Sequence, residues 1–514
     1  MEMIGKNFVQ DILIPRPRHR KGNVKDICLL IVAAATLGIY FLLNKPAFHK
    51  PSLNEIRKCA IDNINVDLSF LDSARPINTN EFLQRRDRLA QALLAADADA
   101  FVLEPGYTFQ YYGNVSQADW EPWEPEERPF LMLMLPILSQ SGDVSAKTAF
   151  LAPHFEEGRV RMLGIPSRED DLDIVIWEEH WDPYATLLES HLFADFHGSA
   201  KRRAPKVVID EELRDFISRG LSKAGFETLG LTPEIELVRQ IKSPTEVDIL
   251  RAVNTGTVAA VRATRPCLVP GLTEDEVQGV LNEVLQSIGF EPFFNIVLFE
   301  EDGALPHGGF IVGSKKVTED TMVVIDVGAH YLGYSSDICR SFFIDPVRVD
   351  IANRLFPPGH IQDASNPELR EEKLRVWNIV LAAQSAAALA LKPNHTAAGA
   401  DIAARSVIET AGYGERFTHR VGHSIGIKGA PCYIYLLCLT WDFALTGTFA
   451  AHESPYLNQW NREARLQPGM IFTNEPGIYI EGKFGVRHED VYLVKQYGEA
   501  ELLTGRRATG PYNP

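Results

Sequence analysis

Two aspartates, Asp326 and Asp337, lie in a stretch of the chain that has the pattern of a β-hairpin. An apolar, β-branched run contains Asp326, a run of small and apolar residues contains Asp337, and residues 330–333 between them favour a turn. With the turn centred near Tyr331 and Leu332, the two aspartates pair across the hairpin, with Cβ atoms roughly 5 Å apart on one face. Carboxylates at that distance repel each other, which indicates a bound cation, such as two divalent metals about 3.5–4 Å apart. Ordinary turn or surface aspartates are the alternative interpretation.

Three further side chains could complete such a metal site. His423 lies in the segment HRVGHSIG, and its flanking glycines would let the backbone approach closely. It lies four residues after His419, but the composition is that of a strand and turn, so this is not the helical HExxH arrangement. Glu475 and Glu489 each lie at the margin of an apolar strand. Four carboxylates and one imidazole suit two hard or borderline divalent ions.

Helices with strong N-terminal signals precede these residues. Ser243 and Thr273 are each followed three residues later by glutamate, the capping-box pattern, and predict helices over residues 244–264 and 274–288. A strand over residues 294–299 comes next, and then His307 on a glycine-rich loop, where it can point into a cleft or remain a surface histidine. Longer helices are predicted over residues 371–392 and 396–411, and the domain boundary near residue 240.

The region before this boundary alternates strands and helices, which is typical of an α/β domain. It contains no catalytic constellation. The predicted helices cover residues 81–95 and 210–222, and the predicted strands cover residues 98–103, 129–135 and 207–209.

Composition limits the class of protein. A chain of 514 residues favours two domains, and the net charge of −17 argues against nucleic acid as the main partner. Six cysteines in so long a chain do not make a disulfide framework, and the absence of a CxxC pair makes thiolate zinc sites a poor expectation.

The N-terminal region predicts a membrane anchor. Residues 1–26 form a basic cytoplasmic tail, residues 27–43 an uncharged transmembrane signal anchor, and residues 46–77 a stalk. The positive-inside rule then places the rest of the chain on the lumenal or extracytoplasmic side. Two glycosylation sequons, at Asn114 and Asn394, suit that location. A cleaved signal peptide and a mitochondrial presequence are the alternatives.

The motifs DVGAHYLGYSSDICRSF, HRVGHSIG, NEPG and VRHEDV together resemble the dinuclear metallopeptidases of the pita-bread fold, such as prolidase, aminopeptidase P and methionine aminopeptidase. The resemblance implies an α+β pita-bread catalytic domain over residues 241–507, preceded by a smaller α/β domain of the creatinase and prolidase type over residues 78–240. Methionine aminopeptidases lack the preceding domain and fit less well. In the resembling family the metal ligands fall on Asp326, Asp337, His423, Glu475 and Glu489.

The resemblance also implies roles for individual residues. Asp337 and Glu489 match the bridging ligands, His307 and His452 match histidines that contact substrate or the tetrahedral intermediate, and Arg487 matches a residue near the substrate's carboxylate end. Two metals, with manganese expected first and cobalt or zinc admissible, would yield a bridging hydroxide near neutral pH. Glu475 would shuttle the proton, so Glu475, His307 and His452 are the predicted catalytic residues.

The implied activity is hydrolysis of the bond between an N-terminal residue and proline in proline-containing peptides. A strict Xaa-Pro dipeptidase and a non-catalytic peptide-binding module on the same fold are the alternatives. A metal-free hydrolase of the creatinase type is disfavoured by the five ligand positions. A homodimer is expected, because dimers are common in the resembling family.

Residues 429–451 depart from the family pattern, in which the glycine-rich histidine motif runs almost directly into the next histidine motif. This segment is strongly apolar and carries one charge, Asp442. We interpret it as translated intron sequence left by an erroneous gene model; a genuine hydrophobic flap or partner-binding insertion is the alternative. A spliced transcript that retains these codons would exclude the intron interpretation.

Overall fold

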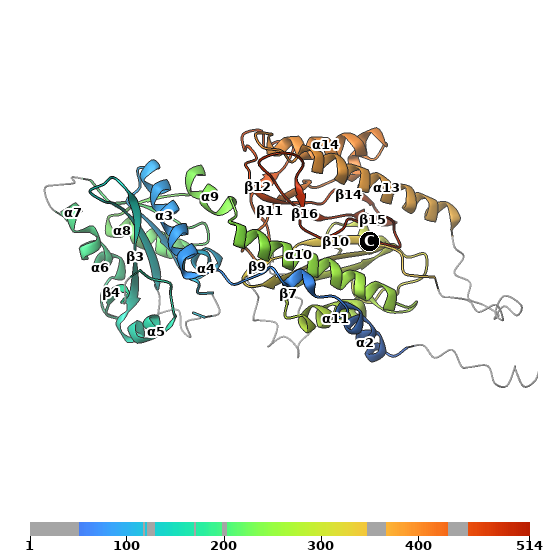
Figure 1. The fold of residues 1–514 in the computed structure, drawn as a ribbon, viewed down its shortest axis with the longest axis horizontal. Helices are drawn as coiled ribbons and strands as arrows, with labels where there is room; N and C mark the ends of the chain where they lie inside the picture. Colours follow the sequence, from blue (N-terminus) through green and yellow to red (C-terminus); the bar gives the residue numbers. More distant parts are fainter. Residues whose placement is uncertain are drawn as a thin grey trace, which may run out of the picture. The chain divides into compact units, whose positions relative to one another are not determined.

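The computed structural model describes residues 51–116, 119–120, 129–168, 171–197, 203–346, 366–429 and 451–514 (Figure 1). Leu53–Pro514 form one compact unit, so the domain boundary predicted near residue 240 stays a prediction. The predicted anchor at residues 27–43 lies outside the described residues. Within the described ranges, no helix is both long enough and apolar enough to cross a membrane.

The N-terminal part of this unit is built on a six-stranded mixed sheet in the order β4-β3-β2-β1-β5-β6. The predicted alternation of strands and helices is confirmed. Helix α8 begins at Asp215 rather than at Asp210. Asp210 directly follows β5 and still donates its N–H to the Val102 carbonyl of β1, and its own carbonyl accepts from the Leu213 N–H in a turn that precedes the helix. The elements are α3 (Thr79–Ala95), β1 (Ala100–Leu103), α4 (Tyr107–Gly113), β2 (Leu131–Leu138), β3 (Val144–Pro153), α5 (Glu157–Met162), β4 (Asp173–Trp177), α6 (Pro183–Glu189), α7 (Ala194–His197), β5 (Lys206–Ile209), α8 (Asp215–Ala224), β6 (Glu227–Leu229) and α9 (Pro233–Gln240).

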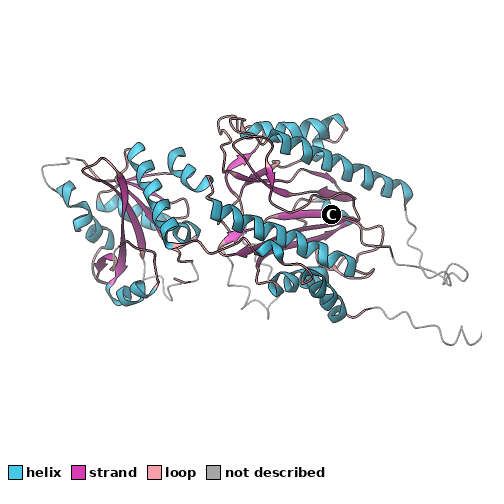
Figure 2. Ribbon diagram, in the orientation of Figure 1, coloured by secondary structure: helices cyan, strands magenta, loops and turns pink. Residues whose placement is uncertain are grey.

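The C-terminal part repeats one plan twice: two helices followed by strands. In Figure 2 the strands of this part lie between the two helix pairs. The first half contains α10 (Pro244–Thr264), α11 (Glu274–Ser287), β7 (Glu291–Phe299), β8 (Val323–Tyr331), β9 (Tyr334–Ser335) and β10 (Ile338–Phe342). The second half contains α13 (Pro367–Ala390), α14 (Ala397–Thr410), β11 (Gly422–Ser424), β12 (Glu453–Leu457), β13 (Ile471–Asn474), β14 (Gly477–Ile480), β15 (Phe484–Arg487), β16 (Asp490–Leu493) and β17 (Glu501–Leu502).

Both predicted capping boxes are confirmed. The Ser243 side chain accepts a hydrogen bond from the Glu246 N–H, and the Glu246 carboxylate accepts one from the Ser243 N–H. Thr273 and Glu276 make the same reciprocal pair at the start of α11. These caps fix where each helix begins, and therefore which apolar stripe each helix turns toward the strands.

Two apolar cores hold the helix pairs against the sheets. The inner faces of α10 and α11 pack on β7 and β8, and those of α13 and α14 pack on β13 to β16. The sheets are ordered β10-β8-β7, with β9 paired to β8, and β12-β11-β13-β16-β17, while β14 pairs with β15. The predicted α+β pita-bread architecture with an α/β domain before it is confirmed.

The predicted stalk over residues 46–77 is wrong for its described part. Helix α2 (Leu53–Ile64) buries Ile56, Ala60 and Ile64 in the same core as α10 and α11. A disulfide joins Cys59 on α2 to Cys267 just after α10. Three apolar side chains at helical spacing, too few to stand out in the sequence, dock this helix on the C-terminal part.

Candidate metal centre

The hairpin of β8, β9 and β10 exists, but its register differs from the prediction. The turn is Leu332-Gly333, both with positive φ, so Asp326 pairs with Cys339 instead of Asp337. A two-residue turn of this kind matches the twist of the strands. Because side chains alternate with a period of two, a shift of the partner by two residues keeps both aspartates on the same face.

Asp337 lies in the short break between β9 and β10, where its backbone contacts helix α10. Its N–H donates to the Asn254 side chain at 3.3 Å, and the neighbouring Ser336 hydroxyl lies 2.7 Å from the Thr257 hydroxyl. Asn254 and Thr257 are fully buried polar residues in the middle of α10, where most of the neighbouring buried side chains are apolar. Sequence analysis missed both, although polar residues at one-turn spacing inside an apolar stripe could have indicated them.

The second half of the domain supplies the other predicted ligands. His423 is the middle residue of β11, Glu475 follows β13, and Glu489 separates β15 from β16. The Glu475 N–H donates to the Val421 carbonyl at 2.7 Å, and the Glu489 N–H donates to the Cys339 carbonyl at 3.0 Å. The second of these bonds ties the two halves of the domain together at the site.

All five predicted ligands converge. Their donor atoms fall into overlapping groups, each with its atoms within 4.8 Å of one another: Asp326, Asp337 and Glu489; His423, Glu475 and Glu489; and Asp337, His423 and His452. The site is therefore assembled from strands separated by more than 150 positions in the sequence, and the sequence-based set is brought together complete.

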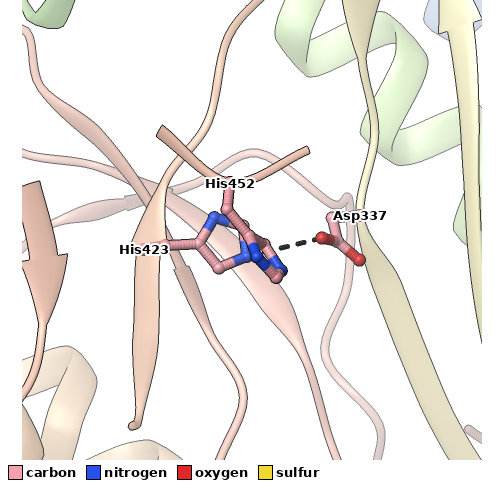
Figure 3. Close-up of side chains that lie close together, drawn as sticks. All are labelled: Asp337, His423 and His452. Carbon is pink, nitrogen blue, oxygen red and sulfur yellow. Dashed lines mark ion pairs between the residues drawn. The ribbon is translucent and has the colours of Figure 1, made fainter. Parts of the chain in front are cut away.

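The histidines differ from the predicted arrangement in one respect. The His423 Nε2 lies 3.4 Å from the Asp337 carboxylate and 3.6 Å from that of Glu475. The His452 ring packs on the His423 ring, with centroids 4.2 Å apart, and both face Asp337 (Figure 3). His452 was predicted to contact substrate. One of its ring nitrogens lies within 4.8 Å of an Asp337 carboxylate oxygen, so the two side chains could also bind the same metal ion.

The electrostatics of this cluster favour cations. Burial, reinforced by Asp326, raises the pKa of Asp337 well above its ordinary value, and burial with Asp337 and Glu475 does the same for Glu489. Burial also raises the pKa of Glu475 to about 7, although His423 and Arg487 oppose it. The positive side chains near these three carboxylates therefore do not offset their burial and mutual repulsion.

Buried polar atoms without a hydrogen-bond partner give the same result independently. Among the described residues these include the Asp326 Oδ1, the Glu489 Oε1 and the His423 Nε2. Such atoms are rare in native proteins, and here they belong to hard oxygen donors and one imidazole. The donor set therefore fits two divalent metal ions.

Arg487 and Tyr479 form a support for Asp326. The Arg487 guanidinium contacts the Asp326 Oδ2 at 2.5 Å and donates to the Tyr479 hydroxyl at 2.7 Å and to the Pro306 carbonyl at 2.8 Å. His419 contacts the same hydroxyl at 2.8 Å. The contacts of Arg487 are thus with the protein itself, and its predicted substrate contact stays a prediction. Nothing in the sequence singled out Tyr479.

The remaining predicted histidines are neutral. Burial, followed by the charges of His423 and Arg420, lowers the pKa of His452 to about 2. Desolvation and the positive charge of Arg487 lower the pKa of His307, which lies on the loop after β7. A neutral imidazole can donate or accept a hydrogen bond, so both can contact a polar substrate group.

The predicted need for glycine beside His423 is confirmed. A Cβ on Gly422 would lie 2.2 Å from the Thr473 carbonyl oxygen, and one on Gly426 would lie 2.7 Å from the Lys242 Nζ. The first close approach lets the His423 N–H reach the Thr473 hydroxyl at 3.0 Å.

Residues 430–450 of the anomalous segment, which was predicted over residues 429–451, lie outside the described residues, but the strands on either side of the segment are paired. Ser424 on β11 is the ladder partner of Glu453 on β12, and the Lys428 N–H donates to the Glu453 carboxylate at 2.9 Å. Strand β11, before the segment, therefore pairs with β12, which follows it. A direct connection of Lys428 to His452 is compatible with this pairing. The intron interpretation stays a prediction for transcript sequencing.

Comparison with known proteins identifies the family. Residues 248–496 match the model of metallopeptidase family M24. An uncharacterized peptidase of Schizosaccharomyces pombe is 34% identical over 495 residues, which cover 95% of this chain and 94% of that protein. The chain belongs to metallopeptidase family M24. The site described above is therefore that of a metal-dependent peptidase.

A further related sequence and a solved structure have more specific names. An Xaa-Pro dipeptidase of Pyrococcus furiosus is 31% identical over 275 residues, 53% of this chain and 66% of that protein. The crystal structure of dipeptidase PepE from Mycobacterium ulcerans superposes with a TM-score of 0.64 and 25% identity, covering 84% of this chain and 98% of that one.

Proposed function

We propose that this M24 metallopeptidase is an exopeptidase that hydrolyses the bond between an N-terminal residue and proline. The observation that carries the proposal is the convergence of Asp326, Asp337, His423, Glu475 and Glu489 with unpaired donor atoms. The name of the Pyrococcus furiosus relative supports proline specificity. That name also favours the second candidate, a strict Xaa-Pro dipeptidase. The complete donor set argues against a non-catalytic binding module.

Two divalent ions, when bound, would lower the pKa of a shared water and polarise the scissile carbonyl. Manganese is the proposed metal, with cobalt or zinc admissible for this donor set. Asp326, Asp337, His423, Glu475 and Glu489 would hold the ions.

The chain's own residues supply proton transfer and positioning. Glu475, which lies within the donor cluster, would accept the proton of the attacking water and return it during hydrolysis. The neutral imidazoles of His452 and His307 can donate hydrogen bonds to the carbonyl oxygen or to the leaving nitrogen. Arg487 fixes the Asp326 carboxylate through its 2.5 Å contact.

The proposal keeps the predicted location, a single-pass membrane protein with its N-terminus in the cytoplasm and its catalytic domain on the lumenal or extracytoplasmic side. The Cys59–Cys267 disulfide supports this, because disulfides persist mainly in oxidising compartments. A homodimer also remains a proposal.

The test compares substrates of different length. The full chain is purified in detergent, loaded with manganese and given an Xaa-Pro dipeptide and an Xaa-Pro-Yaa tripeptide, with the isosteric variant Asp337→Asn as control. Cleavage of the tripeptide, lost in the variant, supports an aminopeptidase. Cleavage of the dipeptide alone supports the strict dipeptidase. Failure to cleave either peptide by protein that holds two metals per chain would overturn proline specificity.

A further inference from the structure

The loop between α13 and α14 presents a glycosylation sequon, Asn394-His395-Thr396, on the surface of the catalytic part. Asn394 and His395 are exposed, and Asn394 has a positive φ of 65°. Within the described ranges the Asn394 side-chain amide makes no hydrogen bond, whereas its backbone is fully engaged. The side chain is therefore available to solvent and to modification.

The backbone of this sequon is held in place by a neighbouring loop. The Asn394 N–H donates to the Leu466 carbonyl at 2.8 Å, and the Leu466 N–H donates to the His395 carbonyl at 2.9 Å. Thr396 caps α14 by accepting from the Gly399 N–H at 3.2 Å. A bulky hydrophilic group on Asn394 would thus extend into solvent without displacing a packed side chain.

A second observation points to the compartment in which such a group is added. Cys59 and Cys267 are disulfide-bonded although 208 residues separate them in the sequence. The bond joins the exposed Cys59 on α2 to the buried Cys267 just after α10. Because the apolar face of α2 packs in one core with α10 and α11, the disulfide forms part of the folded catalytic unit. Disulfides of this kind are typical of secreted and lumenal proteins.

We propose that Asn394 carries an N-linked glycan, attached while the chain folds in an oxidising lumen. Oligosaccharide transfer forms a bond between the Asn394 amide nitrogen and C1 of the first sugar. It breaks the bond from that carbon to the phosphate of the lipid-linked donor, and the lipid phosphate and one amide proton leave. The inference does not depend on peptidase activity.

The other sequon, at Asn114, must be removed so that any glycan reports on Asn394 alone. Asn114 is the C-cap of α4, with φ of 55°. Glycine adopts this conformation without strain, so Asn114→Gly abolishes the sequon and preserves the helix end.

The experiment uses the full chain, expressed in its native cells with the Asn114→Gly change, and two variants at Thr396. Thr396→Ser keeps both the sequon and the cap, whereas Thr396→Asp keeps an N-cap residue but destroys the sequon. Digestion with peptide N-glycosidase should increase the gel mobility of the parent and of Thr396→Ser, and leave Thr396→Asp unchanged. Mass spectrometry should show Asn394 converted to aspartate after release.

Folding is checked separately from glycosylation. Every chain is digested without reduction, and the peptide pair joined through Cys59 and Cys267 should appear in all three. A parent chain whose mobility does not change on digestion overturns the proposal, as does a Thr396→Asp variant that still shifts.

Discussion

Two glutamates in the catalytic part, Glu453 and Glu489, are both almost fully buried, but their pKa values are shifted in opposite directions. Burial raises the pKa of Glu453, but Lys242 and Arg239 more than offset it and lower the value to about 2. Burial and the carboxylates of Asp337 and Glu475 raise the pKa of Glu489 well above its ordinary value. The Glu453 carboxylate lies 3.3 Å from the Lys242 Nζ, whereas the Glu489 Oε1 has no hydrogen-bond partner among the described residues.

This difference separates charge that serves the fold from charge that serves a ligand. A buried carboxylate that the chain itself neutralises stabilises one arrangement of helices and strands. A buried carboxylate that lies among other carboxylates is stabilised only when a cation binds, and clusters of this kind are typical of functional sites. Lys242 comes just after α9, so the Glu453 pair ties β12, next to His452, to the start of the catalytic part.

The largest effect is expected from Glu489→Gln. The variant should lose bound metal and reduce kcat/KM by about 10³-fold or more, since metal catalysis supplies several kcal/mol of transition-state stabilisation. Without metal, the same variant should melt no lower than the metal-free parent, because an amide removes repulsion with Asp337. Metal analysis and thermal melting check this. A variant that binds two metals normally would contradict the assignment of Glu489.

The next largest effect is expected from Lys242→Met, which leaves the Glu453 carboxylate without its nearest cation. Removing one partner of a buried pair costs about 3–5 kcal/mol, so the free energy of unfolding should fall by that amount. The double variant Lys242→Met with Glu453→Leu should recover most of the loss, because it replaces the pair by apolar groups. Denaturant unfolding measures both. If the double variant is as unstable as the single one, the pair is not the cause.

The same pair predicts a pH dependence. The pKa of Glu453 in the folded state, about 2, is below the unfolded value of about 4.3. Its stabilising contribution is therefore fully present above about pH 4.3 and is lost as the pH falls toward the folded pKa. The stability gap between the parent and Lys242→Met should be widest near neutral pH and narrow on acidification. A gap that widens as the pH falls would contradict this sign.

The smallest effect on stability is expected in a third buried cluster, formed by Arg85, Glu246 and Tyr334 of β9 in the hairpin that carries Asp326 and Asp337. Arg85 on α3 donates to the Tyr334 hydroxyl at 2.8 Å, and that hydroxyl donates to Glu246 at 3.0 Å. Tyr334→Phe should lower the free energy of unfolding by about 1–2 kcal/mol, because Arg85 and Glu246 still neutralise each other at 3.6 Å. Metal content should not change. A loss of metal would show that this cluster also positions Asp337.

Much of the site could be predicted because its chemistry is local in the sequence. The motifs around Asp326, His423 and Glu489 each combine a donor residue with the glycines or apolar strands that position it. The contacts of Arg487 could not be predicted in this way. Its partners Asp326, Tyr479 and Pro306 come from three separate segments, and no periodicity connects them.

The sequence by itself determined the capped helices α10 and α11, the identity of the five donor residues and the alternation of strands and helices before them. The helices and the alternation follow from hydrogen bonds and side-chain periodicities that act within a few residues, and the donor residues follow from their motifs and the family resemblance. Only the tertiary structure decided the hairpin register, the docking of α2 with its Cys59–Cys267 disulfide, and which buried carboxylates are neutralised. Each of these depends on burial and on partners far away in the sequence, and the free energy of a buried charge is set by its three-dimensional surroundings.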